Sequence, residues 1–396
     1  MFKFWIKNKK LISADSAAST PLDRRVALAM ARAEARTVGN PSSIHRQGVL
    51  ASRELEKARL LVAKSLKAEP DEIIFTSGGT ESNNLAILGA STAWAKKNQQ
   101  PGRVVTVATE HKSVLAPIQS LGEKGWVVDI LPVDTHGRVD VKKIDVKLLA
   151  DTVLISVSFA NNEIGTLHQI REIAKLVRLA RKTTQSAYPL FHVDACQAPR
   201  FFDLDVRKLG ADLLTLNSSK IYGPKGSGIL YKTRATEILP ILRGGGQEQG
   251  LRSGTPNVLG AVGLAEALTI CGEKAIKENE KLAGLRDLFV VLAKKELPGV
   301  VFHGDLAERL PNNLNFTLSG VDAEWAVLWL DSQGIEASTG SACSNNFTTN
   351  NHVLEALYGK EAPKEGSIRL SFGRAVQEKD VRQIIQTLKE MPRSSV

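Results

Sequence analysis

Short apolar runs alternate with helical patterns between residues 70 and 232, and this alternation predicts the main architecture of the chain. Strands are expected where a short run is rich in β-branched or apolar residues, at 73–76, 104–107, 127–131, 153–158, 190–193, 213–216 and 228–231. The last strand is expected to run antiparallel to its neighbour, across the turn at 223–226. Strands that alternate with helices indicate an α/β fold with a mostly parallel sheet. Ligands of such sheets lie at the carboxyl ends of strands.

The pattern changes after the three glycines at 244–246. A long helix is expected from Pro256 to about Glu296, where Pro298 and Gly299 end it. The remainder has short strands at 313–318 and 367–372 and helices at 323–330 and 376–391, which is typical of a small α+β domain. We therefore expect an N-terminal segment at 1–20 packed with the small domain, a large domain at 21–262 and the small domain at 263–396.

Composition narrows the class of protein. The 396 residues are 43% hydrophobic and 24% charged, as expected of a soluble globular protein, and no apolar run is long enough for a transmembrane helix. Cys196, Cys271 and Cys343 match no metal-binding spacing, so no metal is expected, and the odd number of thiols fits a reducing cytosol. The net charge is +10, but four positive charges lie in the first ten residues. Without a basic motif elsewhere, nucleic-acid binding is not expected.

Three motifs in the large domain carry residues suited to chemistry, and each also has a plainer interpretation. The glycine-rich turn at 76–83 leads from a strand into a helix, so its amides could hold an anion or simply begin the helix. Asp194 ends an apolar strand and could bind a ligand or cap a turn. Lys220 lies between a strand and a Gly/Pro turn, where partial burial would favour a neutral, nucleophilic amine; a surface lysine is the alternative.

Three further motifs lie later in the chain. Segment 244–255 combines glycines with Arg252 and Thr255 before a helix, which argues for more than a flexible linker. Cys343 occupies a polar loop of small residues and is the candidate nucleophile, whereas Cys271 fits a helical apolar pattern. Arg369 lies in an apolar strand and is suited to clamp a carboxylate.

The order of these motifs is more informative than any one of them. An anion-binding turn, a strand-end carboxylate, a nearby lysine and a late arginine are what an enzyme dependent on pyridoxal 5'-phosphate requires. The phosphate needs an anchor, the ring nitrogen needs a carboxylate, the aldehyde needs an amine and the substrate carboxylate needs a cation.

The sequence resembles the cysteine desulfurases, within the class V aminotransferase-like enzymes of fold type I. The resemblance covers nearly the whole chain, from Ile12 to about Met391, and rests on the stretches DSAASTP, GNPSS, TSGGTESNN, TEHKSV, NNEIG, HVDACQ, SKIYGPKG, GGGQEQGLRSGT, TGSACS and SIRLSFGR. It implies a large domain with a mostly parallel sheet of the seven-stranded type and a smaller domain that carries a catalytic cysteine loop. It also implies that the large domain binds pyridoxal 5'-phosphate.

The resemblance implies roles around the cofactor ring. Lys220 would form the Schiff base and move protons at the substrate Cα. Asp194 would keep the pyridine nitrogen protonated. His111 would stack on the ring and could act as acid or base. Gln197 and Asn162 would face the phenolic oxygen of the ring and the substrate.

The resemblance also implies a phosphate site and one departure from the family pattern. Gly79 and Thr80 would bind the phosphate, with Thr255 reaching it from the second subunit of a homodimer. The family usually has histidine immediately before the Schiff-base lysine and often serine two residues before that. Ser219 and Asn217 stand at these positions and can still hydrogen-bond a phosphate.

The implied reaction removes sulfur from L-cysteine. Arg369 would fix the substrate carboxylate, and the Cys343 thiolate would attack the substrate sulfur, so that a persulfide forms on Cys343 and alanine leaves. The long stretch after Cys343 resembles the subgroup whose sulfur acceptors are iron–sulfur scaffold proteins or tRNA-thiolation enzymes. Only ten residues precede the first motif, so no transit peptide is expected and the location is expected to be cytoplasmic, without membrane attachment.

Three alternatives remain open. A selenocysteine lyase or another class V enzyme would use the same cofactor, although Cys343 argues against simple transamination. A divergent scaffold lacking the cofactor would explain Ser219 and Asn217, but the proton-transfer positions are all present. A nucleic-acid-binding module lacks any supporting motif.

Overall fold

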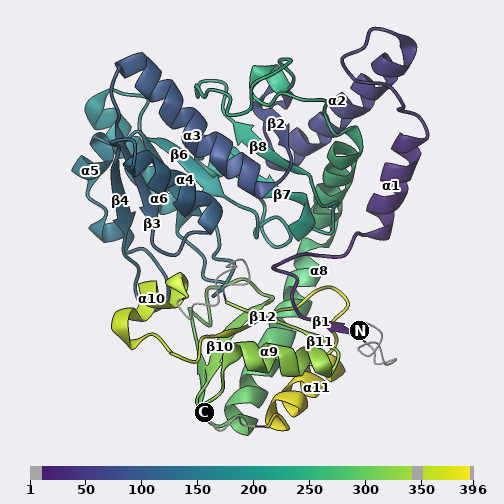
Figure 1. Cartoon of the computed structure of the whole chain (residues 1–396), viewed down its shortest axis with the longest axis vertical. Coiled ribbons are helices and arrows are strands. Elements are labelled where there is room, and N and C mark those ends of the chain that lie inside the picture. Colours follow the sequence, from purple (N-terminus) through teal and green to yellow (C-terminus); the bar gives the residue numbers. More distant parts are fainter. Residues whose placement is uncertain (1–10, 341–350, 393–396) are drawn as a thin grey trace.

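The computed structural model describes residues 11–340 and 351–392. Its central feature is a seven-stranded sheet in the order β2-β8-β7-β6-β5-β3-β4 (Figure 1). Only β8 runs antiparallel to its two neighbours, so the mostly parallel α/β sheet expected from the sequence is confirmed. The strands are β2 (Ile73–Thr76), β3 (Arg103–Val107), β4 (Val127–Leu131), β5 (Leu154–Ser158), β6 (Leu190–Asp194), β7 (Leu213–Asn217) and β8 (Gly228–Lys232).

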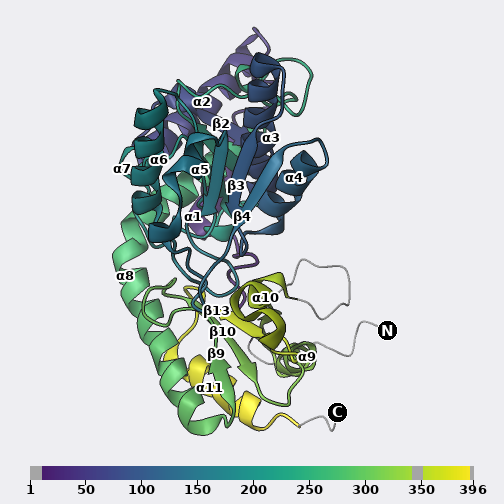
Figure 2. The same cartoon turned by 90° about the vertical axis from the view of Figure 1, so that its left-hand side faces the viewer.

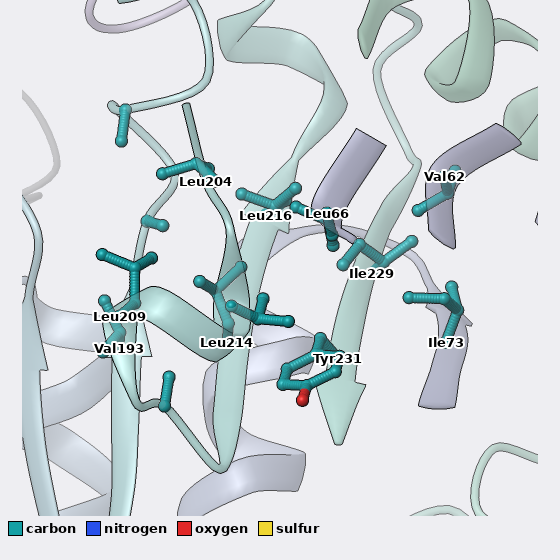
Figure 3. Close-up of a cluster of buried hydrophobic side chains, with 14 of the residues drawn as sticks. Val62, Leu66, Ile73, Val193, Leu204, Leu209, Leu214, Leu216, Ile229 and Tyr231 are labelled. Carbon is teal, nitrogen blue, oxygen red and sulfur yellow. The ribbon is translucent and has the colours of Figure 1, made fainter. Parts of the chain in front are cut away.

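Helices cover both faces of this sheet. One face packs against α3 (Gly79–Asn98) and α4 (Lys112–Gly122). The other packs against α1 (Arg24–Glu34), α2 (Arg46–Leu66), α6 (Ile170–Thr184), α7 (Val206–Leu209) and the first part of α8 (Val258–Glu296). Figure 3 shows part of the core on this face, to which Val193, Leu214 and Ile229 of the sheet and Leu66 of α2 all belong. The short helix α5 (Val146–Ala150) contacts α6.

Side-chain alternation along β6 decides which groups face α3 and α4. Phe191 and Val193 belong to the core on the α2 side, whereas Leu190 packs with the α3 and α4 core. Because neighbouring strand residues point to opposite faces, His192 and Asp194 also point toward α3 and α4. The Asp194 carboxylate therefore lies on the face of the sheet that α3 and α4 cover, near the N-terminal ends of these two helices.

A second core surrounds a four-stranded sheet in the order β12-β13-β10-β9. The elements after α8 are β9 (Val300–Phe302), β10 (Asn313–Leu318), α9 (Ala323–Ser332), β11 (Ile335–Glu336), β12 (Ser338–Thr339), α10 (His352–Tyr358), β13 (Ile368–Ser371) and α11 (Glu378–Lys389), of which α10 packs against Ile164 instead. Near the N-terminus, β1 (Ile12–Ser13) pairs with β11. Figure 2 shows α8 running continuously past both cores. The division at residue 262, which falls inside this helix, remains a prediction.

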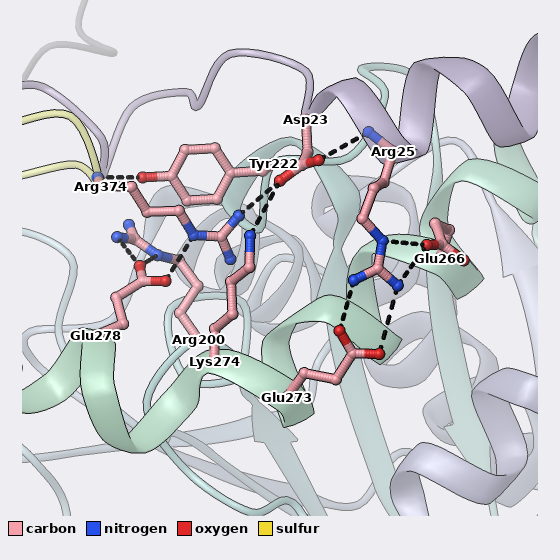
Figure 4. A network of polar contacts seen from close by, with 9 residues as sticks. All are labelled: Asp23, Arg25, Arg200, Tyr222, Glu266, Glu273, Lys274, Glu278 and Arg374. Carbon is pink, nitrogen blue, oxygen red and sulfur yellow. Dashed lines mark hydrogen bonds and ion pairs between the residues drawn. The ribbon is translucent and has the colours of Figure 1, made fainter.

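A polar network around Tyr222 joins the two parts of the molecule (Figure 4). Arg374, which follows β13, donates to Glu278 of α8 at 2.6 Å and to Asp23 at 3.0 Å. Its backbone N–H donates to the Tyr222 hydroxyl at 2.7 Å, and its guanidinium lies 4.0 Å from the centre of the Tyr222 ring. The loop after β13 is thus tied to a residue two positions beyond Lys220. Within the described parts of the chain, no helix is both long and apolar enough to cross a membrane.

Candidate active site

A cavity of about 330 Å³ opens where the strands of the large sheet end, and it contains most of the residues singled out in the sequence. Its volume lies in the range of small-molecule sites. Strand order explains the gathering, because β5, β6 and β7 are neighbours and their carboxyl ends share one edge. The lining residues with an expected role are Gly79, Thr80, His111, Asn162, Asp194, Gln197, Asn217, Lys220 and Arg369.

The N-terminus of α3 forms one end of the cavity. Gly78 precedes the helix with φ of 150° and offers no side-chain cap, so the first helical amides stay available to an anion. A Cβ on Gly79 would come within 2.8 Å of the Cys196 Sγ, so only glycine permits this close approach. Asn217 lies beside Gly79, and its Oδ1 accepts a hydrogen bond from the Ser219 backbone N–H at 3.2 Å. This end is suited to a phosphate.

The Asp194 carboxylate lies deeper in the cavity and is almost fully buried, with 8% of the residue exposed. One oxygen accepts from Asn83 Nδ2 at 2.7 Å, and the other accepts from the Cys196 backbone N–H at 3.0 Å. His111 caps the N-terminus of α4 nearby, and its Nδ1 accepts from the Ser113 backbone N–H at 3.0 Å. Burial lowers the pKa of His111, which favours the neutral imidazole.

Lys220 is held in place by the N-terminal segment. Its Nζ donates to the Ala18 carbonyl at 2.5 Å. The turn that carries it is braced by Thr20, whose backbone N–H donates to the Ser219 carbonyl at 2.8 Å and whose hydroxyl accepts from Tyr222 N–H at 2.7 Å. Tyr222 has φ of 63°, so the chain turns sharply after Lys220. The amine is therefore directed into the cavity by contacts remote in sequence.

Arg369 comes from β13, on the opposite side of the cavity. Its side chain is 4% exposed and pairs with Asp15 at 2.8 Å, while a second guanidinium nitrogen donates to the Asn162 carbonyl at 3.3 Å. Its Nε has no hydrogen-bond partner among the described residues. Gln197 also meets the N-terminal segment, because its amide donates to the Ala17 carbonyl at 3.1 Å. The guanidinium thus retains capacity for a substrate carboxylate.

Besides Cys196, six polar lining residues were not expected to be functional, namely Asn83, Lys112, Ser113, Ser158, Glu163 and His352. Four of them do fall within quoted motifs, which was the available signal: Asn83 in TSGGTESNN, Lys112 and Ser113 in TEHKSV, and Glu163 in NNEIG. Burial raises the pKa of Glu163 to about 7, and its carboxylate accepts from the Asn351 side chain at 2.9 Å. His352 Nε2 contacts the Glu110 carbonyl at 3.0 Å. The turn after β5 and the start of α10 therefore also form cavity wall.

Other expected residues lie elsewhere. Cys343 falls in 341–350, outside the described residues. Thr255 is exposed and does not line the cavity of its own chain. Ser219 is partly buried beside Lys220 but is not a lining residue. Cys271 is buried in α8, as expected, whereas Cys196 lines the cavity.

Glu110 makes stability depend on pH. It is fully buried next to His111, and burial raises its carboxyl pKa to about 8, against about 4.3 in an unfolded chain. Its stabilising contribution is therefore complete below the unfolded pKa and is lost as pH rises through the folded pKa. We expect the free energy of unfolding of wild type, relative to Glu110→Gln, to fall between about pH 5 and pH 9.

Urea denaturation at a series of pH values measures this difference. Groups common to both proteins, including the buried histidines, cancel in the comparison. Glu163→Gln is the matched control, since its own difference should level off above about pH 7 rather than above about pH 8. A difference independent of pH would show that Glu110 is ionised at neutral pH in the folded protein.

Comparisons with known proteins agree with this geometry. A family model described as aminotransferase class-V matches residues 12–384. Cysteine desulfurase IscS of Dictyoglomus turgidum is 40% identical over 384 residues, covering 97% of this chain and 95% of that protein. Cysteine desulfurase IscS 1 of Archaeoglobus fulgidus is 40% identical over 375 residues, covering 94% and 95%.

Solved structures give the same result. A NifS-like protein superimposes with a TM-score of 0.88 at 33% identity, covering 96% of this chain and 99% of that one. DndA from Streptomyces lividans superimposes with a TM-score of 0.73 at 34% identity, covering 89% and 97%.

Proposed function

The chain belongs to the class-V aminotransferase family and is a cysteine desulfurase, and on that premise we propose that its cavity binds pyridoxal 5'-phosphate and L-cysteine. The observation that carries the proposal is the convergence of Lys220, Asp194 and the uncapped start of α3 in one cavity. The same comparisons favour this activity over a selenocysteine lyase or a scaffold without cofactor.

The cavity fits the cofactor. Buried side-chain oxygens of Asn83 and Ser158 line it and have no hydrogen-bond partner among the described residues, so a polar ligand would satisfy them. Gly79 and Thr80 offer amides for the phosphate, with Asn217 and the nearby Ser219 as further polar groups. The buried carboxylate of Asp194 suits a protonated pyridine nitrogen. When bound, the group supplies an electron sink for bonds at the substrate Cα.

Each of the cavity residues then has a separate role in the proposed reaction. Lys220 provides the amine that holds the cofactor and afterwards moves the proton at the substrate Cα. His111, which lines the cavity, would lie against the cofactor and, as a neutral imidazole, could exchange a proton. Gln197 and Asn162 orient the phenolic oxygen and the substrate. Arg369 binds the substrate carboxylate through guanidinium N–H groups that do not donate to Asp15.

Cys343 is the proposed sulfur acceptor. Its thiolate attacks the substrate sulfur, so that the S–S bond forms and the Cβ–S bond breaks. The bonding pair stays with Cβ, which is protonated to give alanine, and the persulfide remains on Cys343. The segment that contains Cys343 connects Gly340 with Asn351, and Glu163 lies beside both. Gly340, the last described residue before Cys343, lines the cavity, which supports this proposal.

We propose further that the enzyme is a cytoplasmic homodimer that passes sulfur to an acceptor protein, either an iron–sulfur scaffold or a tRNA-thiolation enzyme. Exposed apolar side chains support the dimer, since Val38 and Ile44 between α1 and α2 are 85% and 98% exposed. In such a dimer, the exposed Thr255 would serve the partner's phosphate site. A reducing compartment suits thiol chemistry.

Sulfur transfer can be tested directly. Incubating the holoenzyme with L-cysteine should release alanine and add one sulfur atom to the peptide that contains Cys343, as detected by mass spectrometry. Cys343→Ser should lose that added sulfur because the acceptor thiolate is absent. Cys271→Ala is the matched control and should retain it, since this thiol is buried in α8. Alanine release without persulfide at Cys343, or no alanine at all, would contradict the proposed function.

A further inference from the structure

Asn83 of α3 joins two of the proposed catalytic groups. It is only 1% exposed, and its side-chain nitrogen lies 2.7 Å from Asp194 Oδ2 and 2.8 Å from Ser113 Oγ. Ser113 Oγ in turn lies 2.7 Å from His111 Nδ1. The side chains of Asp194, Asn83, Ser113 and His111 therefore form one continuous hydrogen-bonded chain in a buried part of the cavity wall.

The chemistry of the groups fixes the direction of each hydrogen bond. A carboxylate only accepts, so the Asn83 amide directs one N–H to Asp194 and the other to the Ser113 oxygen. Because Ser113 Oγ accepts from Asn83, its own proton is available to His111 Nδ1. The Ser113 backbone N–H also donates to this nitrogen at 3.0 Å. Neutral His111 must therefore carry its proton on Nε2.

The fold brings these four residues together from three elements. Asp194 ends β6 on the sheet face covered by α3 and α4, Asn83 lies in the first turns of α3, and Ser113 follows His111 at the start of α4. Helices α3 and α4 pack against each other as well as on the sheet. The hydrogen-bonded chain thus lies in the packed core, and two of its side chains, Asn83 and Ser113, take part in no step of the proposed reaction.

We propose that Asn83 and Ser113 act as one relay that positions Asp194 and His111 relative to each other and fixes the tautomer of His111. This inference rests on the proposed function, because it concerns the same cavity. Both residues are positioning residues, since they act through Asp194 and His111. Supporting groups around an active site typically change activity by about 10- to 100-fold when they are removed.

The relay predicts the direction in which the titration midpoint of His111 changes when the relay is broken. The ionisable groups that act on its imidazole are Lys112 beside it in the chain, and Asp194, Lys220 and His352 from other elements. Donation to Nδ1 stabilises the neutral ring, so removing the Ser113 hydroxyl should raise the pH at which His111 titrates. Removing Asn83 should do the same, because the Ser113 oxygen becomes free to accept from a protonated Nδ1.

The test compares Asn83→Ala, Ser113→Ala and the double variant in the holoenzyme. Each single change should lower kcat for alanine release about tenfold, with the KM for cysteine changed less than about threefold. Because the residues act as a unit, the double variant should also lose about tenfold rather than about a hundredfold. Asn84→Ala and Ser120→Ala are matched controls on the same helices. Their side chains bond only local carbonyls, so their kcat should be unchanged.

A second measurement separates the relay from general destabilisation. Nuclear magnetic resonance of ¹⁵N-labelled histidine should report His111 protonated on Nε2 in wild type and should show its titration midpoint raised in both single variants. Losses of kcat that multiply in the double variant, or an unchanged midpoint in Ser113→Ala, would overturn the relay. If Asn83→Ala does not fold, the kcat and the titration midpoint of Ser113→Ala are sufficient to test the relay. If wild type releases no alanine, the proposed function fails, while the titration still tests the relay.

Discussion

Replacing Lys220 with alanine is expected to lower kcat for alanine release by about 10⁴-fold or more. The amine both holds the cofactor and moves the proton at the substrate Cα, and within the described cavity wall no other lysine but Lys112 is present. Lys112 begins α4, a different element, and does not share the braced turn of Lys220. The visible absorbance of the lysine-bound cofactor should disappear together with activity.

Lys225→Ala provides the matched control for this variant. Lys225 belongs to the same Gly/Pro turn but is exposed and does not line the cavity, so both absorbance and kcat should remain those of wild type. A small primary amine added to Lys220→Ala should restore part of the turnover, because it can occupy the space of the missing side chain. Full activity in Lys220→Ala would assign the amine function to another residue.

The sequence predicted the sheet well because its signals are local. The expected strands at 73–76, 127–131 and 313–318 have the same bounds as β2, β4 and β10. Asp194 and Lys220 could also be placed near each other from sequence, since each follows or ends a strand of one parallel sheet. Local periodicity and strand-end chemistry were therefore sufficient for the groups that the sheet itself positions.

Residues positioned by tertiary packing could not be found in this way. Asn83 faces Asp194 only because α3 covers the same sheet face toward which β6 directs its even-numbered residues. Arg369 meets Asp15 across 354 positions of sequence, and no local pattern reports such a pair. His352 enters the cavity because α10 packs back against the Glu110 carbonyl. Each of these contacts depends on how separate elements dock.

Asp194→Asn is expected to lower kcat by about 10²–10³-fold while leaving the protein folded. The change keeps the size and shape of the side chain but removes the negative charge that pairs with a protonated pyridine nitrogen. The single amide oxygen of the new side chain can accept from Asn83 or from the Cys196 backbone N–H but not from both, so one of these hydrogen bonds is lost while packing is largely preserved. The loss should appear in kcat from steady-state alanine release, because the charge is needed most when negative charge develops at the substrate Cα.

Asp205→Asn is the matched control for Asp194→Asn. It also replaces a carboxylate that accepts from backbone N–H groups, but Asp205 lies outside the cavity, where it caps the start of α7. Its kcat should therefore be unchanged. If Asp194→Asn kept wild-type kcat, the carboxylate would have a structural role only. Cofactor activation would then depend on Lys220 and the start of α3 without a negative charge at the pyridine nitrogen. A parallel loss in Asp205→Asn would instead indicate that helix and turn capping, rather than charge at the ring, limits the reaction.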